Sequence, residues 1–365
     1  MSILRPACYK KFADIIEAIY QRFEQGTGAP KQDITDKAEL EAFLTQTITT
    51  ALGEKASTNL TASTDLFSYG VDSLQATRVR NVISKSLELG DVSLGQNIVY
   101  EHPSISQLAA YLLAIKSGDS AERSAEQGHS TMLAMVDKWA DKVVKPEAVA
   151  ISSSAQTNGH GGQVVVLTGA TGSLGAHILD QLINDPSVSK VVCLSRAKSH
   201  DDSLKRIHQS LAERERSISA EASAKIQSFA SDVNQPTLGL SNEHYETLRQ
   251  SVTSVIHNAW PVNFVLSIES FDEHIGGAVN LLNLTLKSDK KIKPAFFFSS
   301  SVGTRQGRVE KLVTEDFSDS PVTAGGMGYG RSKWVVEKLC ERAGANNGAR
   351  IGVLRIGQLV GDTEQ

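Results

Sequence analysis

Cysteine is scarce in this sequence of 365 residues, which contains only Cys8, Cys193 and Cys340 at widely separated positions. Such scattered cysteines favour neither a disulfide framework nor a thiolate metal site, and they are typical of a reducing compartment. The nine histidines show no HExxH arrangement and no pairing with cysteine at metal-binding spacing. We therefore predict no metal site.

The sequence also lacks an excess of charge of one sign and any long apolar run. Its 37 basic and 41 acidic residues give a net charge of −4, which disfavours nucleic acid as a partner. The most apolar runs, such as VVVL and AFFF, are far shorter than the ~20 residues that span a bilayer. The N-terminus has no apolar signal-peptide core. We expect a cytoplasmic protein that binds neither nucleic acid nor membrane.

The chain length and a shift in composition predict two domains joined by a linker. At about 150 residues per domain, this length allows two domains plus connecting segments. Two polar stretches, SGDSAERSAEQGHS and SSSAQTNGHGG, are expected to be flexible linkers. Between them, TMLAMVDKWADKVV predicts a helix that docks on a neighbouring domain through Leu133, Val136, Trp139 and Val143.

Helical patterns dominate before the linker, and strands alternate with helices after it. The expected helices of the first part are residues 12–23, 37–52, 73–87 and 105–115. After residue 162, the runs VVVLTG, KVVCLS, SVIHNA, AFFFSS and IGVLRIG alternate with helical stretches. This alternation predicts βαβ units and a parallel sheet. The fold class is therefore multidomain, with an all-α bundle of four helices followed by an α/β Rossmann domain.

A serine stands where the third of these helices begins, in DLFSYGVDSLQATRVRNVI. Leu74, Thr77, Val79 and Ile83 are available to face a core. Asp72 or Ser73 could be a plain helix cap that satisfies amide groups of the first turn. The surrounding pattern, which closes with EHPSISQLAAYL, points to a second interpretation.

Residues 35–116 resemble a phosphopantetheine carrier domain. The resemblance implies that Ser73 carries 4′-phosphopantetheine, which a phosphopantetheinyl transferase attaches, and that Asp72 serves in recognition by that transferase. A phosphodiester at this place is physically favourable, because a helix N-terminus offers free N–H groups and positive dipole character.

A glycine-rich turn follows the first expected strand of the second domain. VVVL runs into TGATGSLG and then into an amphipathic helix, which is the context of a dinucleotide-binding turn. The cofactor-binding residues expected in it are Gly169, Thr171, Gly172, Ser173, Leu174 and Gly175. The next strand ends in Ser195 and Arg196 rather than in an acidic residue, which favours NADPH over NADH. Arg196 could instead be an ordinary surface arginine.

A tyrosine and a lysine four residues apart, Tyr329 and Lys333, lie in the run YGRSK. This spacing places both side chains on one face of a helix. A tyrosine with a reference pKa of about 10 is a poor proton-transfer group near neutral pH, and a lysine one turn away lowers that pKa. The strand AFFFSSS, which precedes them, ends in hydroxyls where a third catalytic donor would lie.

These features resemble the extended short-chain dehydrogenase/reductase family, and HNAWPVNFVLSIESF narrows the resemblance to thioester reductase domains of nonribosomal-peptide-synthetase-like and aminoadipate-reductase-like enzymes. The resemblance covers residues 163–365. It implies that Tyr329 is the acid, Lys333 its modulator and Ser301 the hydroxyl that holds the substrate oxygen. Aligning the strand-end triplet selects Ser301, while Ser299 and Ser300 remain alternatives.

The same resemblance assigns further cofactor contacts. Asp232 would lie at the adenine side, Asn258 and Ala259 would line the cofactor, and residues 356–358 would lie near the nicotinamide. Trp260 stands where relatives usually carry a small residue, so it either narrows the pocket or is simple packing. His257 is interpreted as a structural histidine rather than a base.

The resemblance also suggests how the whole chain is organised. Residues 1–34 are similar to the end of an adenylation domain, 35–116 form the carrier, 117–162 a linker with one amphipathic helix, and 163–365 a reductase domain. Family members continue into a substrate-binding subdomain, so the chain resembles a fragment of an adenylation–carrier–reductase enzyme.

The implied function is NADPH-dependent reduction of an acyl thioester on the carrier arm, with release of an aldehyde or an alcohol. Two alternatives stay open. One is an epimerase or dehydratase of the same extended fold, and the other is a non-catalytic carrier and docking fragment that only binds nucleotide.

Overall fold

The computed structural model describes residues 12–13, 31–53, 60–90, 94–95, 98–117, 121–145, 162–264, 266–307 and 313–359. The chain divides into two compact units, Met1–Arg123 and Ser124–Gln365, each with its own hydrophobic core. Within the described ranges, no helix is long and apolar enough to span a bilayer. The helix expected over 12–23 and the polar stretch at 152–162 lie almost wholly outside these ranges.

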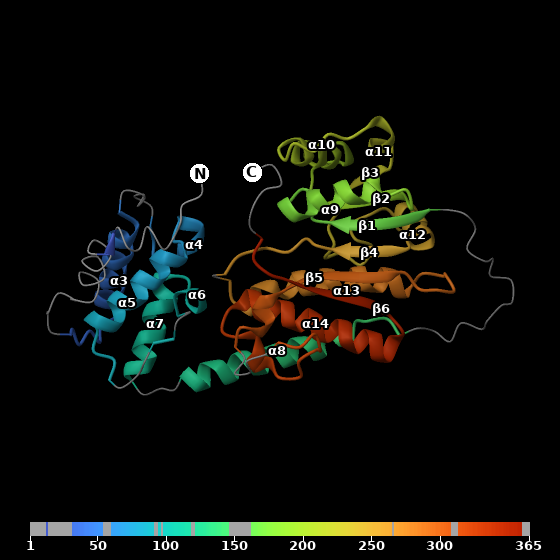
Figure 1. The fold of residues 1–365 in the computed structure, drawn as a ribbon. Helices are drawn as coiled ribbons and strands as arrows, with labels where there is room; N and C mark the ends of the chain where they lie inside the picture. Colours follow the sequence, from blue (N-terminus) through green and yellow to red (C-terminus); the bar gives the residue numbers. More distant parts are fainter. Residues whose placement is uncertain are drawn as a thin grey trace. The chain divides into compact units, whose positions relative to one another are not determined.

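The first unit is helical (Figure 1). Its helices are α3 (Lys37–Leu52), α4 (Leu66–Tyr69), α5 (Ser73–Ser86), α6 (Ile98–Glu101) and α7 (Ile105–Lys116). Leu40, Leu44 and Ile48 recur every four residues along α3, so one stripe of that helix is buried against α5 and α7. The helices expected over 37–52, 73–87 and 105–115 are thus present to within one residue at each end.

One expected core residue of this unit lies at the surface instead. Leu74 is 77% exposed, whereas Ala76, Val79 and Ile83 are buried. The buried stripe of α5 follows the spacing of three and four residues that ends at Ile83, and Leu74 falls on the opposite side of the first turn. The expectation for Leu74 was therefore wrong, and so was that for Thr77, which is also exposed.

The second unit contains a six-stranded parallel sheet in the order β3-β2-β1-β4-β5-β6. The strands are β1 (Gln163–Thr168), β2 (Val188–Ser195), β3 (Ile226–Ala230), β4 (Ser254–His257), β5 (Ala295–Ser301) and β6 (Arg350–Ile356). The α-helices between them are α9 (Ser173–Asn184), α10 (His200–Ala212), α11 (Ala220–Ala224), α12 (Asn242–Ser251), α13 (Asp272–Leu286) and α14 (Gly328–Asn347). Short 3-10 turns occupy Ile268–Phe271 (η2), Val302–Arg305 (η3) and Pro321–Ala324 (η4). This strand order is that of a Rossmann fold, as the sequence predicted.

Helices cover both faces of the sheet, because alternate residues of each strand point to opposite sides. On β1, Val165 and Leu167 belong to the core beneath α9, α10 and α11. Val166 belongs to the larger core that includes residues of α12, α13 and α14. Because all six strands are parallel, their carboxyl ends meet at one edge of the sheet, which is where a ligand binds in such a fold.

A long helix, α8 (Ala121–Ala140), precedes the sheet and lies along α13 and α14 (Figure 1). The stretch SGDSAERSAEQGHS was expected to be a flexible linker, yet its residues from Ala121 onward are helical. At Gly128 this helix lies against the Arg331 side chain of α14, because a Cβ there would meet the Arg331 guanidinium. Of the four residues predicted to dock, Val136 and Val143 are buried and Trp139 packs against the core, whereas Leu133 is 44% exposed, so the prediction for Leu133 was wrong.

Polar contacts fix the end of α8 to the second unit. Trp139 Nε1 donates to Asp272 Oδ1 at 2.9 Å, and Lys138 pairs with the other oxygen of Asp272 at 2.6 Å. Asp137 pairs with Arg342 of α14 at 2.7 Å. The docking expected for this helix is thus present, and its partners are α13 and α14.

Candidate functional site

The start of α5 in the first unit is capped by side chains. Asp72 Oδ1 accepts from Gln75 N at 2.9 Å, and Gln75 Oε1 accepts from Asp72 N at 2.7 Å, which forms a capping box. Asp72 is therefore the helix cap, and Ser73 is the first residue of the helix that follows a glycine turn at Gly70. This arrangement leaves position 73 at the positive end of a helix of fourteen residues.

The glycine-rich turn of the second unit forms a cradle between β1, α9 and β4. Gly169 has a φ of 78°, and a Cβ there would lie 2.9 Å from Ala259 N. A Cβ at Gly175 would clash with the Gly169 carbonyl oxygen. Gly172 is the N-cap of α9 and offers no side-chain oxygen, so the first N–H groups of α9 lack a cap from this residue. The backbone here fits a pyrophosphate, as the motif predicted.

Thr168 joins the first strand to the fourth at this edge. Its hydroxyl oxygen accepts from the backbone N–H groups of Asn258 and Ala259 at 3.1 and 3.0 Å. Its proton is therefore available to His257 Nδ1, 2.8 Å away, which makes that nitrogen an acceptor in a neutral ring. Burial lowers the pKa of His257 to about 3, with Lys333 and His274 adding to the shift. His257 therefore connects β4 to Thr168 of β1 as a neutral side chain, which fits the structural role expected for it rather than that of a base.

The ends of β2 and β3 carry the two residues expected near the adenosine. Arg196 directly follows β2 and is exposed, and its carbonyl oxygen accepts from the Arg206 guanidinium. Asp232 follows β3 by two residues and stabilises its own turn, because Asp232 Oδ1 accepts from Asn234 N at 3.1 Å. Both residues thus stand at the carboxyl edge of the sheet, beside the glycine turn.

Tyr329 and Lys333 lie on α14, which approaches the end of β5 closely. A Cβ at Gly330 would lie 2.8 Å from the Gly303 carbonyl oxygen, and one at Gly328 would clash with the Leu266 carbonyl oxygen. The two glycines that flank Tyr329 therefore permit the first turn of α14 to pack against the neighbouring backbone.

The three serines that end β5 face three successive turns of α14. Lys333 Nζ donates to the Ser299 carbonyl oxygen at 2.5 Å. Ser300 Oγ donates to Glu337 Oε1 at 2.5 Å. Ser301 Oγ accepts from Gly303 N at 3.1 Å, and the Ser301 hydroxyl lies near enough to Tyr329 to influence the pKa of that phenol. Of the three hydroxyls, the one that contacts Tyr329 is therefore that of Ser301.

Burial dominates the electrostatics of this cluster. It raises the pKa of Tyr329 above its ordinary value, and the nearby Ser301 hydroxyl opposes this effect. The lowering of this pKa expected from Lys333 was therefore wrong, because burial outweighs the influence of the lysine. It lowers the pKa of Lys333 to about 7, and the carboxylate of Glu337 opposes that shift. At neutral pH the tyrosine is thus a protonated donor, and the lysine is near the midpoint of its titration.

Trp260 forms part of the wall around Lys333. Its ring centroid lies 4.6 Å from Lys333 Nζ, and its Nε1 donates to Ser332 Oγ at 3.3 Å. The ring of Phe298 lies at the same distance from Nζ. The side chain of Trp260 therefore packs on the catalytic lysine candidate itself.

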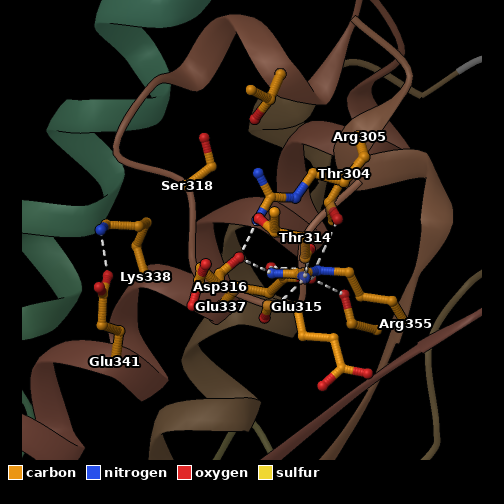
Figure 2. A network of polar contacts seen from close by, with 12 residues as sticks. Thr304, Arg305, Thr314, Glu315, Asp316, Ser318, Glu337, Lys338, Glu341 and Arg355 are labelled. Carbon is orange, nitrogen blue, oxygen red and sulfur yellow. Dashed lines mark hydrogen bonds and ion pairs between the residues drawn. The ribbon is translucent and has the colours of Figure 1, made fainter. Parts of the chain in front are cut away.

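Two residues of the cluster were missed by the sequence analysis. Glu337 is 2% exposed and pairs with Arg355 of β6 at 2.7 Å (Figure 2). The only sequence signal for Glu337 is its position four residues after Lys333, and nothing marks Arg355. Ile356, expected near the nicotinamide, pairs with Ser301 across β5 and β6. Within the described ranges, no group of three or more His, Cys, Asp or Glu side chains could hold a metal ion.

Comparison with known families assigns both units. Residues 167–365 match the model of an NAD-binding family described as "Male sterility protein". The chain belongs to this family. Residues 42–112 match a second model, described as "Phosphopantetheine attachment site". The chain thus joins a phosphopantetheine attachment domain to a domain of this NAD-binding family, which confirms both resemblances seen in the sequence.

Individual relatives show the same arrangement. A carboxylic acid reductase of Neurospora crassa is 32% identical over 374 residues, which cover 100% of this chain and 34% of that protein. The adenylate-forming reductase Nps10 of Heterobasidion annosum is 31% identical over 367 residues, which cover 99% of this chain and 33% of that protein. The chain therefore spans about a third of the length of these relatives.

A solved structure shares the fold of the second unit. The crystal structure of the terminal R domain from the myxalamid PKS-NRPS biosynthetic pathway superposes with a TM-score of 0.51. The two chains are 28% identical, and the match covers 62% of this chain and 56% of that one.

Proposed function

We propose that this chain reduces an acyl thioester carried on its own phosphopantetheine arm to an aldehyde, with NADPH as the reductant. The observation that carries the proposal is the placement of the Ser301 hydroxyl beside Tyr329, with Lys333 one turn along the same helix as Tyr329. These two hydroxyls converge at the edge of the sheet that also carries the glycine turn. The carrier domain in the same chain supplies the reason why the substrate would be a thioester.

The cofactor would be held by the cradle at the end of β1. The free N–H groups at the start of α9 would bind the pyrophosphate, and Asn258 and Ala259 would border the cofactor. Arg196 would bind the 2′-phosphate that distinguishes NADPH from NADH, and Asp232 would lie at the adenine side. NADPH, when bound, supplies a hydride to the thioester carbonyl carbon.

The residues of the chain act on the carbonyl oxygen. Tyr329 and Ser301 would donate hydrogen bonds to this oxygen and stabilise the negative charge that develops on it. Tyr329 would then deliver its proton, which gives a thiohemiacetal. Collapse of that adduct breaks the carbon–sulfur bond and yields the aldehyde and the pantetheine thiol. A second round of reduction would give the alcohol.

The carrier would deliver the substrate as a tethered group. We place the phosphopantetheine on Ser73, within a carrier of residues 35–116, and the reductase in residues 163–365. A phosphopantetheinyl transferase would add the arm, and an adenylation domain such as the names of the relatives suggest would load it. Tethering replaces affinity for free substrate by a high effective concentration.

A product assay with matched variants tests the proposal. A phosphopantetheinyl transferase would load Ser73 with a benzoyl- or octanoyl-4′-phosphopantetheine arm from the matching acyl coenzyme A. NADPH would then be added and the product identified by mass. We expect aldehyde, with one NADPH oxidised for each thioester consumed. Ser73→Ala should abolish release from the carrier but still allow reduction of the free acyl-pantetheine, whereas Tyr329→Phe should suppress both.

Two results would reject the proposal. Turnover without net oxidation of NADPH would indicate an epimerase or dehydratase, because such enzymes restore their cofactor in each cycle. Binding of NADPH without any turnover of either thioester would indicate a module that only binds nucleotide.

A further inference from the structure

A buried carboxylate lies at the centre of a polar network behind the catalytic cluster (Figure 2). Glu337 Oε1 accepts from Ser300 Oγ at 2.5 Å, from Thr304 Oγ1 at 3.2 Å and from Arg355 Nε at 3.1 Å. Glu337 Oε2 accepts from Arg355 Nε and Nη2 at 3.1 and 2.7 Å. All five bonds come from β5, η3 or β6, so one side chain of α14 connects three other elements.

The guanidinium of Arg355 faces a loop on its other side. Nη1 donates to the carbonyl oxygens of Thr314 and Glu315 at 3.5 and 3.2 Å, and Nη2 donates to that of Asp316 at 3.1 Å. Arg305, at the end of η3, also donates to the Asp316 carbonyl oxygen. Arg355 thus attaches residues 314–316 to Glu337, and the loop borders the turn that directly follows Ser301 (Figure 2).

The same network includes contacts that align α14 with the end of β5. Tyr329, Lys333 and Glu337 are spaced four residues apart, and each contacts a different serine of β5. Because Glu337 binds the middle serine, a shift of α14 along β5 would break its bond to Ser300 and move Tyr329 away from Ser301.

We propose that Glu337 and Arg355 are positioning residues, which hold the catalytic helix in register with β5 and fasten the loop at 314–316 beside the catalytic hydroxyls. The inference rests on the proposed function for the site it positions. The carboxylate has a second effect, because it is the anion that faces Lys333 and counteracts the effect of burial on the pKa of that lysine.

The other charged or titratable groups around Lys333 are few within the described ranges. Tyr329 lies on the same helix with its ring centroid 5.8 Å from Lys333 Nζ. His257 of β4 is neutral, and its pKa is lowered by Lys333. Arg355 of β6 is on the far side of Glu337. Removal of the Glu337 charge should therefore lower the pKa of Lys333 further.

Hydrogen exchange on the full chain tests the positioning role without substrate. Glu337→Gln keeps the shape but removes the charge. Arg355→Lys keeps the buried charge compensated, so its fold should persist, but an ammonium cannot donate in a fork to the carboxylate and the three carbonyls. We expect amide exchange in residues 313–320 to be about 10-fold faster in both variants, as for the loss of one strong hydrogen bond. Glu341→Gln, the same change one turn further along α14, removes an ion pair with Lys338, which also pairs with Asp319. It should therefore affect exchange near residue 319 at most and leave exchange in residues 314–316 unchanged.

The pH dependence of kcat gives a readout that a purely structural role would not move. In the plot of kcat against pH, we expect the transition caused by the titration of Lys333 to shift to lower pH in Glu337→Gln. In Glu341→Gln this transition should stay in place. Wild-type exchange in Arg355→Lys would overturn the proposal, and so would equal effects of Glu337→Gln and Glu341→Gln. If the wild-type chain reduces no thioester, the proposed function fails, but the exchange experiment still decides whether the pair fastens the loop.

Discussion

The Nζ atom of Lys333 lies 4.6 Å from the centroid of the Trp260 ring. Together with Phe298, this ring excludes water from the lysine, which is only 2% exposed. A buried ammonium loses hydration, and the cation–π contacts and the Glu337 carboxylate offset only part of that loss. The pKa of Lys333 is therefore lowered to about 7, and the site is sensitive to pH near neutrality.

Lys333 should make the stability of the reductase domain depend on pH. Its pKa is about 7 in the folded chain and 10.5 when unperturbed, so between these values the unfolded chain binds the additional proton. Stability contributed by Lys333 therefore rises with pH in this window, by up to ~1.4 kcal/mol per pH unit. We expect the free energy of unfolding of the wild type, minus that of Lys333→Met, to increase from about pH 7.5 to about pH 9.

Urea unfolding followed by tryptophan fluorescence measures this difference. All three tryptophans, Trp139, Trp260 and Trp334, belong to the second unit, so the signal reports on that unit. The Lys333→Met variant serves as the reference for other groups that titrate in the same window. An equal difference at both pH values would show that Lys333 is charged to the same extent in the folded and unfolded chains.

Tyr329→Phe should lower kcat for a loaded thioester by about 10²- to 10⁴-fold, the usual contribution of a positioned acid. Burial keeps the Tyr329 hydroxyl protonated at neutral pH, so its loss removes the proton donor itself. NADPH affinity, measured by fluorescence titration, should not change.

Ser301→Ala should cost about 10-fold in kcat, equivalent to one hydrogen bond to the developing oxyanion. Ser300→Ala should cost less, because the Ser300 hydroxyl is bonded to Glu337 and does not contact Tyr329. Single-turnover rates for the two variants compare them directly, and a larger loss in Ser300→Ala would assign the catalytic hydroxyl to Ser300.

Local patterns in the sequence were sufficient for the architecture. The apolar spacing of Leu40, Leu44 and Ile48 predicted α3, and the alternation of β-branched runs with helices predicted the parallel sheet. The start of α8 could not be predicted, because the polar residues after Ala121 become helical in a helix held by Asp272 and Arg342, which are distant in sequence. Tertiary contacts of this kind override local composition.

The candidate site could be predicted from the sequence only where its residues belong to local motifs. Gly169 and Tyr329 belong to motifs whose spacing carries the chemistry, so they could be found without a structure. The three adjacent serines of β5 could not be separated, because only the pleat of the strand and the register of α14 determine which one contacts Tyr329. Arg355 is one of two arginines in β6, and nothing in the strand singles it out, because its role depends on a carboxylate on another element.

Trp139→Ala should destabilise the reductase domain by about 2–3 kcal/mol, somewhat below the value for a fully buried tryptophan. The Trp139 ring lies against Gly276 of α13, where a Cβ would clash with it. The Trp139 Nε1 atom donates to Asp272 Oδ1. Leu133→Ala on the same helix is the control, since Leu133 is 44% exposed and should change stability by less than ~0.5 kcal/mol. Urea unfolding of both variants gives the comparison. Equal effects would mean that α8 does not use the Trp139 face for docking.

Arg196→Ala should weaken NADPH binding by about 10- to 100-fold and leave NADH binding unchanged. Arg196 is the exposed basic residue directly after β2, where the 2′-phosphate of NADPH would lie, and a charged hydrogen bond contributes about 1.5–3 kcal/mol. Lys190→Ala removes the same charge from an exposed position near the opposite end of β2, so it controls for the general electrostatic field. Fluorescence titration of each variant with both cofactors measures the four affinities. An equal loss of NADPH affinity in the two variants, or a loss of NADH affinity in Arg196→Ala, would make Arg196 an ordinary surface arginine.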